Sequence, residues 1–433
     1  MVTTDETTQH RNDWRLLLAL FLLAGIVESQ SFGHLGAFTP LFLGQLHVSP
    51  DQVGTWTGIL SALGFVIGLP LLPFWGVWAE KFSRKLIIVR SAYVEALILT
   101  LAGLSPNVWA LALARFLSGF VLGNTGVMLA LLADVTPRKR LGFAVGLASA
   151  GFPIGSSVGP YLGGLITQHY GVRTLLVVDG VASLAIGLLL TLLLRDEPRI
   201  AQVTRSAGMM IRQAASDIVT SPVVSRLFIL YFLAMFGGAL AQPFVPLLLT
   251  KLYLGEPGAH LDLVPTMIGT SLTLAGVAMA LATPIWGRLG DLVGRWRILP
   301  VCLAMVTVYL AVASVAGTLL TAQAAIVVNG LFLSGVPTTI LALLATLTPR
   351  DRRASVLNFS LLPSQLSWFL GPFVGAGLVA FGLRVPFAVG AVFAAGACGV
   401  AVVLARRLGA TSAEVSAAED EVAATASEAA RSI

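Results

Sequence analysis

The hydrophobic pattern of the chain is a series of long apolar runs separated by short polar segments. Twelve runs are each about 20 residues or longer, enough to cross a hydrocarbon core of about 30 Å as a helix. Because the runs are continuously apolar, they predict helices, whereas the strands of a membrane barrel alternate over shorter segments. The predicted spans cover approximately residues 14–36, 53–75, 86–104, 108–133, 141–166, 174–194, 227–250, 264–286, 298–317, 322–347, 354–380 and 385–405. The sequence therefore predicts an all-α membrane protein with twelve transmembrane helices.

A charged hairpin between two apolar runs occurs twice in the chain. The first copy, PFWGVWAEKFSRK, begins at Pro73, and the second, PIWGRLGDLVGRWR, begins about 211 residues later at Pro284. Further matches follow at nearly the same offset, with LLA before TPR at Leu131 and again at Leu343. A repeat of this length predicts one structural unit built twice. Because each unit holds an even number of spans, both units are expected to have the same orientation in the membrane.

Polar segments separate the two units and follow the second. Between the units, Asp196–Pro198 predicts the end of the sixth span, and a short amphipathic helix is expected around Ala207–Ile218 at the membrane surface. After Arg407 the chain is rich in Ala, Ser and Glu and lacks aromatic residues, so it has little apolar surface to bury. The predicted organisation is an N-terminal six-helix half (1–195), a cytoplasmic linker (196–225), a C-terminal six-helix half (226–408) and a disordered cytoplasmic tail (409–433).

The charged residues are few and gather on one side of the membrane. Hydrophobic residues make up 56% of the chain and charged residues 11%, which excludes an ordinary soluble globular protein. With the N-terminus in the cytoplasm, nearly all lysines and arginines fall on the cytoplasmic side, and only Arg173, Lys251 and Arg384 fall on the opposite side. This positive-inside asymmetry places both termini in the cytoplasm. It also explains the net charge of +6 without a nucleic-acid partner.

The first span and the cysteines need no special role. The apolar run after Asp13 is too long for a signal-peptide core and lacks a clear cleavage site, so we interpret it as a retained helix. Cys302 and Cys398 fall inside predicted spans, where they suggest neither a disulfide framework nor a zinc site. No cofactor or metal ion is therefore expected.

The two hairpins resemble the loop after the second helix in the major facilitator superfamily, and in particular in its twelve-span drug:proton antiporters. The family pattern reads Gly-x-Leu-Ala-Asp-Arg-x-Gly-Arg-Lys. The matches are Gly76, Ala79, Arg84 and Lys85 in the first copy and Gly287, Leu289, Asp291, Gly294 and Arg295 in the second; the first copy departs from the pattern at Trp78, Glu80 and Ser83. The resemblance covers almost the whole chain except both tails.

This resemblance implies that the hairpins close the cytoplasmic side. Glu80 is expected to meet the positive end of a helix in the other half, and Arg84 to meet an acid such as Asp134. The alternative is a basic loop that only anchors the orientation of the chain in the membrane.

The fifth predicted span carries a stripe of glycines and prolines. It matches the antiporter signature Gly-x-x-x-Gly-Pro-x-x-Gly-Gly at Gly155, Gly159, Pro160, Gly163 and Gly164. Glycines four residues apart lie on one helix face and let a neighbouring helix approach closely, while proline permits a bend. The alternative interpretation is generic close packing. Residues 155–159 also fit Gly-x-Ser-x-Gly, but no strand–turn–helix context supports a hydrolase.

Four charged residues stand out inside predicted spans, because a charge at a helix centre costs about 2.5–3.5 kcal/mol on insertion scales and is normally kept for a reason. Glu28 in the first span is the best candidate to carry a proton or to recognise a cation, and Glu95 in the third span is the next. Arg115 fits the family's fourth-helix motif, which is implicated in proton coupling; the alternative is a structural pair with a nearby carboxylate. Asp179 is a further candidate for proton coupling or substrate binding; because it lies near the outer end of the sixth span, the alternative is that it simply faces water or Arg173.

Other polar residues supply weaker candidates. His34, towards the outer end of the first span, belongs either to a proton path or to the structure alone. The C-terminal half has no comparable charge at mid-membrane. Its expected cavity residues, placed by the family's helix arrangement, are Gln242, Asn329, Asn358 and Gln365, with Trp368, Phe236 and Tyr231 as aromatic surface.

These observations favour a proton-coupled transporter in the bacterial inner membrane. The resemblance implies a monomeric antiporter that exports small amphipathic or cationic compounds in exchange for protons, by rocking two halves about a central cavity. No Gly-x-x-x-x-Gly-Lys-Ser/Thr loop is present, so the chain is not expected to use ATP. No metal cluster or nucleophile–base arrangement is recognisable in the sequence, so an enzyme is not expected either. A sugar, metabolite or lysolipid transporter of the same fold is the first alternative. A non-transporting membrane sensor or scaffold is the alternative from another class.

Overall fold

The structure is a computed structural model that describes residues 13–196, 207–349, 352, 356, 357 and 359–407. Within these residues every regular element is a helix, and there is no strand. The predicted tail (409–433) and the cavity candidate Asn358 lie outside the described residues. The all-α fold is confirmed.

The helices follow the predicted spans in order. The N-terminal elements are α1 (Trp14–Gln45), α2 (Pro50–Lys81), α3 (Arg84–Gly103), α4 (Val108–Leu117), η1 (Ser118–Val121), α5 (Asn124–Val135), η2 (Arg138–Arg140), α6 (Leu141–Ser149) and α7 (Gly151–Leu193). After these come α8 (Ala207–Thr220), α9 (Pro222–Ala241), η3 (Gln242–Phe244), α10 (Val245–Leu254), η4 (Leu261–Leu263), α11 (Val264–Val293), α12 (Arg295–Val315), α13 (Leu319–Leu333), α14 (Gly335–Leu347), α16 (Leu362–Leu378), η5 (Val379–Phe381) and a final helix, Val385–Arg407.

The twelve predicted crossings correspond to eleven long apolar segments, because one segment crosses twice. Arg138–Leu193 contains 56 residues, far more than one crossing needs. Gly171 interrupts it with a φ of 84° and a ψ of 166°, a conformation open to glycine. A continuous helix would hold Gly159 and Asp179 about 30 Å apart, yet both contact His34. The chain therefore reverses at Gly171.

Several predicted spans contain a break that the hydrophobic pattern does not show. The predicted span 108–133 divides at Gly123, whose φ is 97°, and the predicted span 322–347 divides at Ser334. These positions are related by the sequence repeat. At the first break the ring of Trp75 occupies the space beside Gly123, and at the second the ring of Trp286 lies beside Gly335. The two hairpin tryptophans therefore make the same contact in both repeats.

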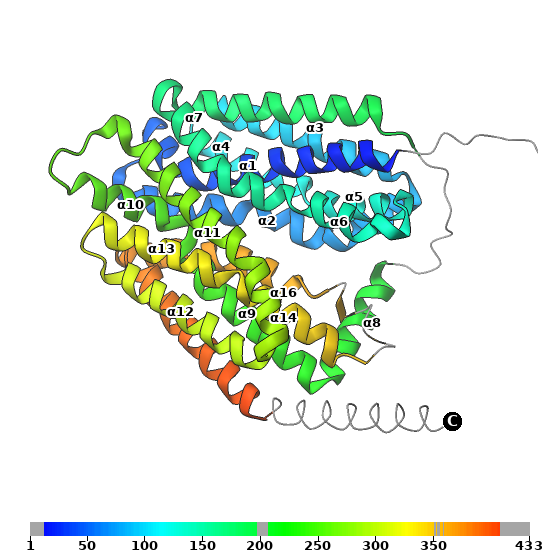
Figure 1. The fold of residues 1–433 in the computed structure, drawn as a ribbon. Helices are drawn as coiled ribbons and strands as arrows, with labels where there is room; N and C mark the ends of the chain where they lie inside the picture. The colour runs from blue at the N-terminus through cyan, green and yellow to red at the C-terminus, as the bar shows by residue number, and fades with distance from the viewer. Residues whose placement is uncertain (1–12, 197–206, 350–351, 353–355, 358, 408–433) are drawn as a thin grey trace, which may run out of the picture.

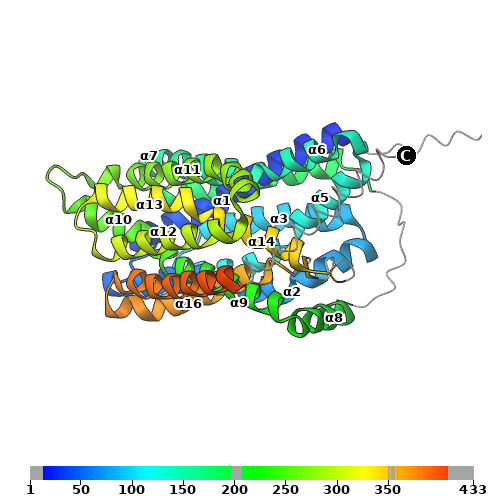
Figure 2. The same cartoon turned by 60° about the horizontal axis from the view of Figure 1, so that its bottom comes forward.

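The helices form two bundles, with α1–α7 in one and α9 to the final helix in the other (Figure 1). We call the membrane side that carries residues 82–85 and 294–297 the hairpin side, and the side that carries Gly171 the far side. The bundles adjoin at the far side, near α10, and their ribbons separate towards α8 at the hairpin side in Figure 1. Figure 2 shows the helices running side by side between these two ends, with α8 at the hairpin end.

Glycines create the contacts between the bundles. A Cβ added to Gly58 on α2 would lie 2.7 Å from the carbonyl oxygen of Pro372, and one added to Gly164 on α7 would lie 2.7 Å from that of Pro265. Gly276 on α11 approaches Ser157 in the same way. No side chain fits at such distances, so these helices pack backbone against backbone. The contacts lie from mid-membrane to the far side, which is closed in this structure.

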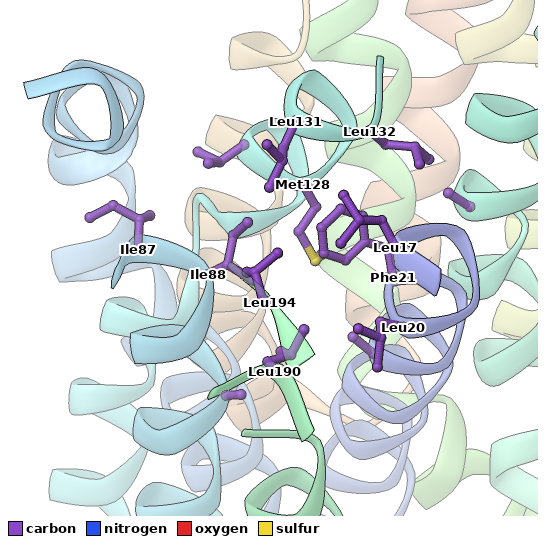
Figure 3. Packing of buried hydrophobic residues seen from close by; sticks show 14 of the residues in the cluster. Leu17, Leu20, Phe21, Ile87, Ile88, Met128, Leu131, Leu132, Leu190 and Leu194 are labelled. Carbon is purple, nitrogen blue, oxygen red and sulfur yellow. The ribbon is translucent and has the colours of Figure 1, made fainter. Parts of the chain in front are cut away.

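A hydrophobic core joins helices of the N-terminal bundle near the hairpin side. Leu17 and Phe21 of α1 meet Ile88 of α3, Met128 of α5 and Leu190 of α7 (Figure 3). Each of these side chains is almost fully buried. The core fixes the spacing of α1, α3, α5 and the second segment of α7, and thereby holds the polar residues described below.

We predict that Gly123→Ala destabilises the protein, because the added Cβ would meet the ring of Trp75 and would sit at a positive φ. The expected cost is about 2–4 kcal/mol, from backbone strain and overpacking together. Thermal unfolding in detergent measures it. Gly126→Ala, three residues along α5 with nothing within 4 Å of the added Cβ, is the matched control. Equal melting temperatures for the two variants would contradict this account of the break.

Candidate functional site

Glu28 on α1 lies at the start of α5. The side-chain amide of Asn124 donates a hydrogen bond to Glu28 Oε2 at 2.9 Å. Asn124 is the first residue of α5, which begins there because Gly123 interrupts the span. The carboxylate therefore faces the positive end of a helix, which favours negative charge. The sequence did not single out Asn124; the signal that could have found it is the glycine before it, since glycine inside a helical pattern lowers helix stability.

Glu95 on α3 shares a small cavity with Glu28. The cavity holds about 10 Å³ for water centres, room for about one water molecule. Its other lining residues are mostly apolar: Ala24, Val27, Ile88, Ala92, Asn124, Met128, Ile186 and Leu190. Glu95 is 7% exposed, and its Oε1 has no hydrogen-bond partner among the described residues. The two acids that the sequence ranked first are thus brought together inside the N-terminal bundle.

His34 and Asp179 form a buried pair that the sequence did not predict. His34 Nδ1 lies 2.9 Å from Asp179 Oδ2 and 3.1 Å from Oδ1, and His34 Nε2 lies 2.8 Å from the carbonyl oxygen of Gly159. The side chains are 0% and 1% exposed. The alternative that Asp179 faces water or Arg173 is therefore wrong. The reversal of the chain at Gly171 turns Asp179 inwards, towards His34. Arg173 instead donates a hydrogen bond to the carbonyl oxygen of Gly103 at 3.3 Å.

The glycine stripe of α7 provides the space for this pair. A Cβ added to Gly163 would lie 2.5 Å from His34 Nε2, and one added to Gly159 would lie 2.9 Å from Gln30 Cγ. Gly155, one turn before Gly159 on α7, meets Ser29 of α1. On its other face α7 meets α11, where Pro160 lies against Gly269. The motif residues thus pack against both α1 and the opposite bundle.

Arg115 on α4 makes a hydrogen bond to the backbone instead of an ion pair. Its Nε donates to the carbonyl oxygen of Leu60 on α2 at 2.9 Å, and the residue is 8% exposed. No carboxylate in the described part of the chain lies within ion-pair distance of it. The alternative of a structural pair with a carboxylate is therefore wrong in this state.

Each hairpin is tied to its own bundle in this structure. Arg84 pairs with Asp134 at 2.5 Å, and Arg295 pairs with Asp291 at 2.9 Å. Gly287 lies near Thr338 of the same bundle. The side-chain environments of Gly76 and Glu80 lie outside the described residues, although both positions fall within α2. The contact expected between Glu80 and the other half stays a prediction.

The cavity candidates of the C-terminal bundle have mixed surroundings. Tyr231 is 2% exposed within a hydrophobic core, and Phe236 is buried between Phe232 and Phe393, so the expectation that these two line an open cavity is wrong. Both pack inwards because α9 contacts several helices of its own bundle. The remaining described candidates are more accessible: Gln242 is exposed, and Asn329, Gln365 and Trp368 are half-buried.

Comparison with known proteins identifies the family. The model of the Major Facilitator Superfamily matches the chain twice, over residues 17–257 and 227–432. The multidrug resistance protein MdtG of Citrobacter koseri (strain ATCC BAA-895) is 28% identical over 288 residues, covering 66% of this chain and 69% of that protein. MdtG of Salmonella typhi is 27% identical over 292 residues, covering 67% and 70%.

Solved structures share the fold at low sequence identity. A bacterial homologue of the human lysosomal transporter Spinster, solved in an inward-facing and unoccupied conformation, has a TM-score of 0.74 at 16% identity, covering 91% of this chain and 97% of that one. The nucleoside transporter NupG has a TM-score of 0.72 at 14% identity, covering 89% and 98%. At these identities the likeness shows the fold alone. Together with the sequence matches, it shows that this chain belongs to the Major Facilitator Superfamily and is a multi-pass membrane transporter, not an enzyme.

Proposed function

We propose that the chain exports small amphipathic or cationic compounds from the bacterial cytoplasm in exchange for protons. The observation that carries this proposal is the cavity shared by Glu28 and Glu95, with a carboxylate oxygen that has no partner among the described residues. The relatives named multidrug resistance proteins support export of varied compounds. Acids buried within membrane helices are normally retained for function.

The cavity favours a protonated acid in the present state. A charged carboxylate without hydrogen-bond partners is costly in apolar surroundings. Glu28 receives a hydrogen bond from Asn124, whereas Glu95 Oε1 receives none that the structure describes. We therefore assign the proton to Glu95 in this state, with Glu28 as the charge that attracts a cation. Loss of the proton places a second negative charge in the cavity and changes which state is favoured.

The two bundles supply an alternating-access mechanism. The basic residues at the hairpin side support a cytoplasmic location of that side. The ribbons of the two bundles separate there, whereas glycine contacts hold them together towards the far side (Figure 1), so we assign this state to the cytoplasm-facing part of the transport cycle. Export then requires the contacts of α7 with α11, and of α2 with α16, to separate while the hairpin side closes. Because α7 touches both α1 and α11, a change around Glu28 reaches the interface through one helix.

We predict that Glu28→Gln and Glu95→Gln each reduce uptake of a fluorescent cation driven by a pH gradient in inverted proteoliposomes. The expected loss is roughly tenfold, within the usual range for coupling between two binding events. Asp51→Asn, an exposed acid at the start of α2, is the matched control and should retain transport. Full gradient-driven transport by both glutamine variants would remove these acids from the mechanism.

We predict that a disulfide between Gln168→Cys on α7 and Thr266→Cys on α11 stops transport. These two side chains are hydrogen-bonded across the bundles in the closed far side, so the bridge would hold that side shut. Cys302 and Cys398 are replaced by alanine in the background. Transport should fall to the level of empty liposomes on oxidation and return on reduction, while each single-cysteine variant stays active. Transport that persists with the bridge formed would contradict movement at this interface.

A further inference from the structure

The imidazole of His34 has a hydrogen-bond acceptor at each nitrogen. Nε2 faces the backbone carbonyl of Gly159, which can only accept, so Nε2 carries a hydrogen. Nδ1 faces the carboxyl group of Asp179 at 2.9 Å, and a hydrogen must lie between them. That hydrogen belongs either to an imidazolium beside a carboxylate or to a carboxylic acid beside a neutral ring. In both arrangements the pair holds one dissociable proton.

Loss of this proton breaks the contact. The nitrogen lone pair of His34 and the carboxylate of Asp179 would then face each other in a site that is almost fully buried. Two acceptors at this distance without a hydrogen repel each other, and burial keeps them from bulk solvent. The pair joins α1 to the second segment of α7, and Nε2 joins α1 to the first segment. The packing of α1 against both segments therefore depends on the proton.

Polar groups extend from this pair towards the cavity of Glu28 and Glu95. Ser183 lies four residues after Asp179, so it is on the same face of α7 one turn further on. Its hydroxyl oxygen and Glu95 Oε1 are both buried without a well-formed hydrogen bond among the described residues, and Ser183 is close enough to Glu95 to act as its hydrogen-bonding neighbour. Glu95 also lines the cavity that Glu28 lines. Exchangeable groups are therefore placed at intervals between the pair and the cavity, and we call this set of groups the row.

Among the described residues, the charged groups around the pair are acids and arginines that bind elsewhere. Glu95 of α3 interacts electrostatically with Asp179 and with Glu28 of α1, and Arg90 of α3 donates to the carbonyl oxygen of Leu122 at 3.4 Å. Arg115 of α4 binds the carbonyl of Leu60, and Arg173 of α7 binds that of Gly103. The charged residues of α5 and α11 lie near the hairpin ends of those helices. The row therefore consists of acids, Ser183 and one histidine, while Arg90, Arg115 and Arg173 bind backbone carbonyl oxygens.

The C-terminal repeat shows that packing alone does not require a histidine here. Gly375 corresponds to Gly163 in the sequence repeat, and it packs against the ring of Phe244 as Gly163 packs against His34. Phe244 is fully buried. A phenyl ring therefore fills the equivalent space in the same fold, and a buried histidine–aspartate pair in one half points to a use for its proton.

We propose that His34 and Asp179 are a second proton-carrying site, which exchanges its proton with Glu95 and Glu28 along a row inside the N-terminal bundle, while the substrate passes between the bundles. This inference rests on the proposed function of proton-coupled export. It predicts the behaviour of a variant that keeps the hydrogen bonds of the pair but has no exchangeable proton there. Such a variant should fold and transport the substrate down its own gradient, but a pH gradient should no longer drive its transport.

The test is the double variant His34→Gln with Asp179→Asn in the full chain, reconstituted in proteoliposomes. The two amides can hydrogen-bond to each other and to Gly159 but cannot titrate. A fluorescent cation is followed with a pH gradient and, separately, down its own gradient at equal pH. His47→Gln, an exposed histidine after α1, is the matched control. We expect downhill transport within about twofold of wild type and a roughly tenfold loss of the gradient-driven component.

The outcomes separate this inference from the proposed function. If a pH gradient drives transport by the double variant as strongly as by the wild type, the second proton-carrying site is overturned. If a folded double variant loses both gradient-driven and downhill transport, the pair has a structural role and the proposal is also overturned. Absence of gradient driving in the wild type itself overturns proton-coupled export instead. If the double variant does not fold, His34→Gln alone enters the same assays, with proton release on addition of the cation as a further readout. Release equal to wild type would overturn the proposal.

Discussion

The close approach of α7 to its neighbours is the constraint on which the rest of the structure depends. Its first segment carries a face of glycines at intervals of four, where any larger side chain would collide with α1. The same segment meets α11 of the other bundle through Pro160 and Gly164. Lipid removes the hydrophobic driving force for association between helices. Contacts of this kind therefore depend on close packing of complementary helix surfaces. The first segment of α7 therefore connects α1 directly to the interface between the bundles.

Charge is distributed unequally over two bundles that share one fold. The tryptophan–glycine contact at Trp75 and Gly123 recurs at Trp286 and Gly335, so the scaffold is repeated faithfully. The buried acids and the buried histidine, by contrast, belong to the N-terminal bundle. Since burying a charge in a membrane protein is costly, the repeat that lacks these residues shows that the fold does not need them. In the proposed function, their concentration in one bundle separates the proton-carrying groups from the surface between the bundles.

The breaks in the helices position the chemistry. Gly123 ends one helical segment and starts α5, which brings Asn124 and the positive end of that helix to Glu28. Gly171 reverses the chain, which brings Asp179 back to His34. In both cases a glycine at positive φ places a polar residue where a straight helix would carry it away. The hydrophobic core at Phe21 and Met128 keeps these segments at a fixed spacing (Figure 3).

The sequence by itself determined the fold class, the number of crossings and the family, because continuous apolar runs and a long repeat depend on composition and order alone. It also ranked Glu28 and Glu95 first, since a charge inside an apolar run is visible without any structure. Only the tertiary structure decided which charges meet. Asp179 was allowed a place at the surface, Arg115 was allowed a carboxylate partner, and Tyr231 was placed in an open cavity, and all three were wrong. Hydropathy records how far a residue lies along a span but not the direction in which its side chain points. That direction follows from the packing of helices distant in sequence, and it made His34 the partner of Asp179.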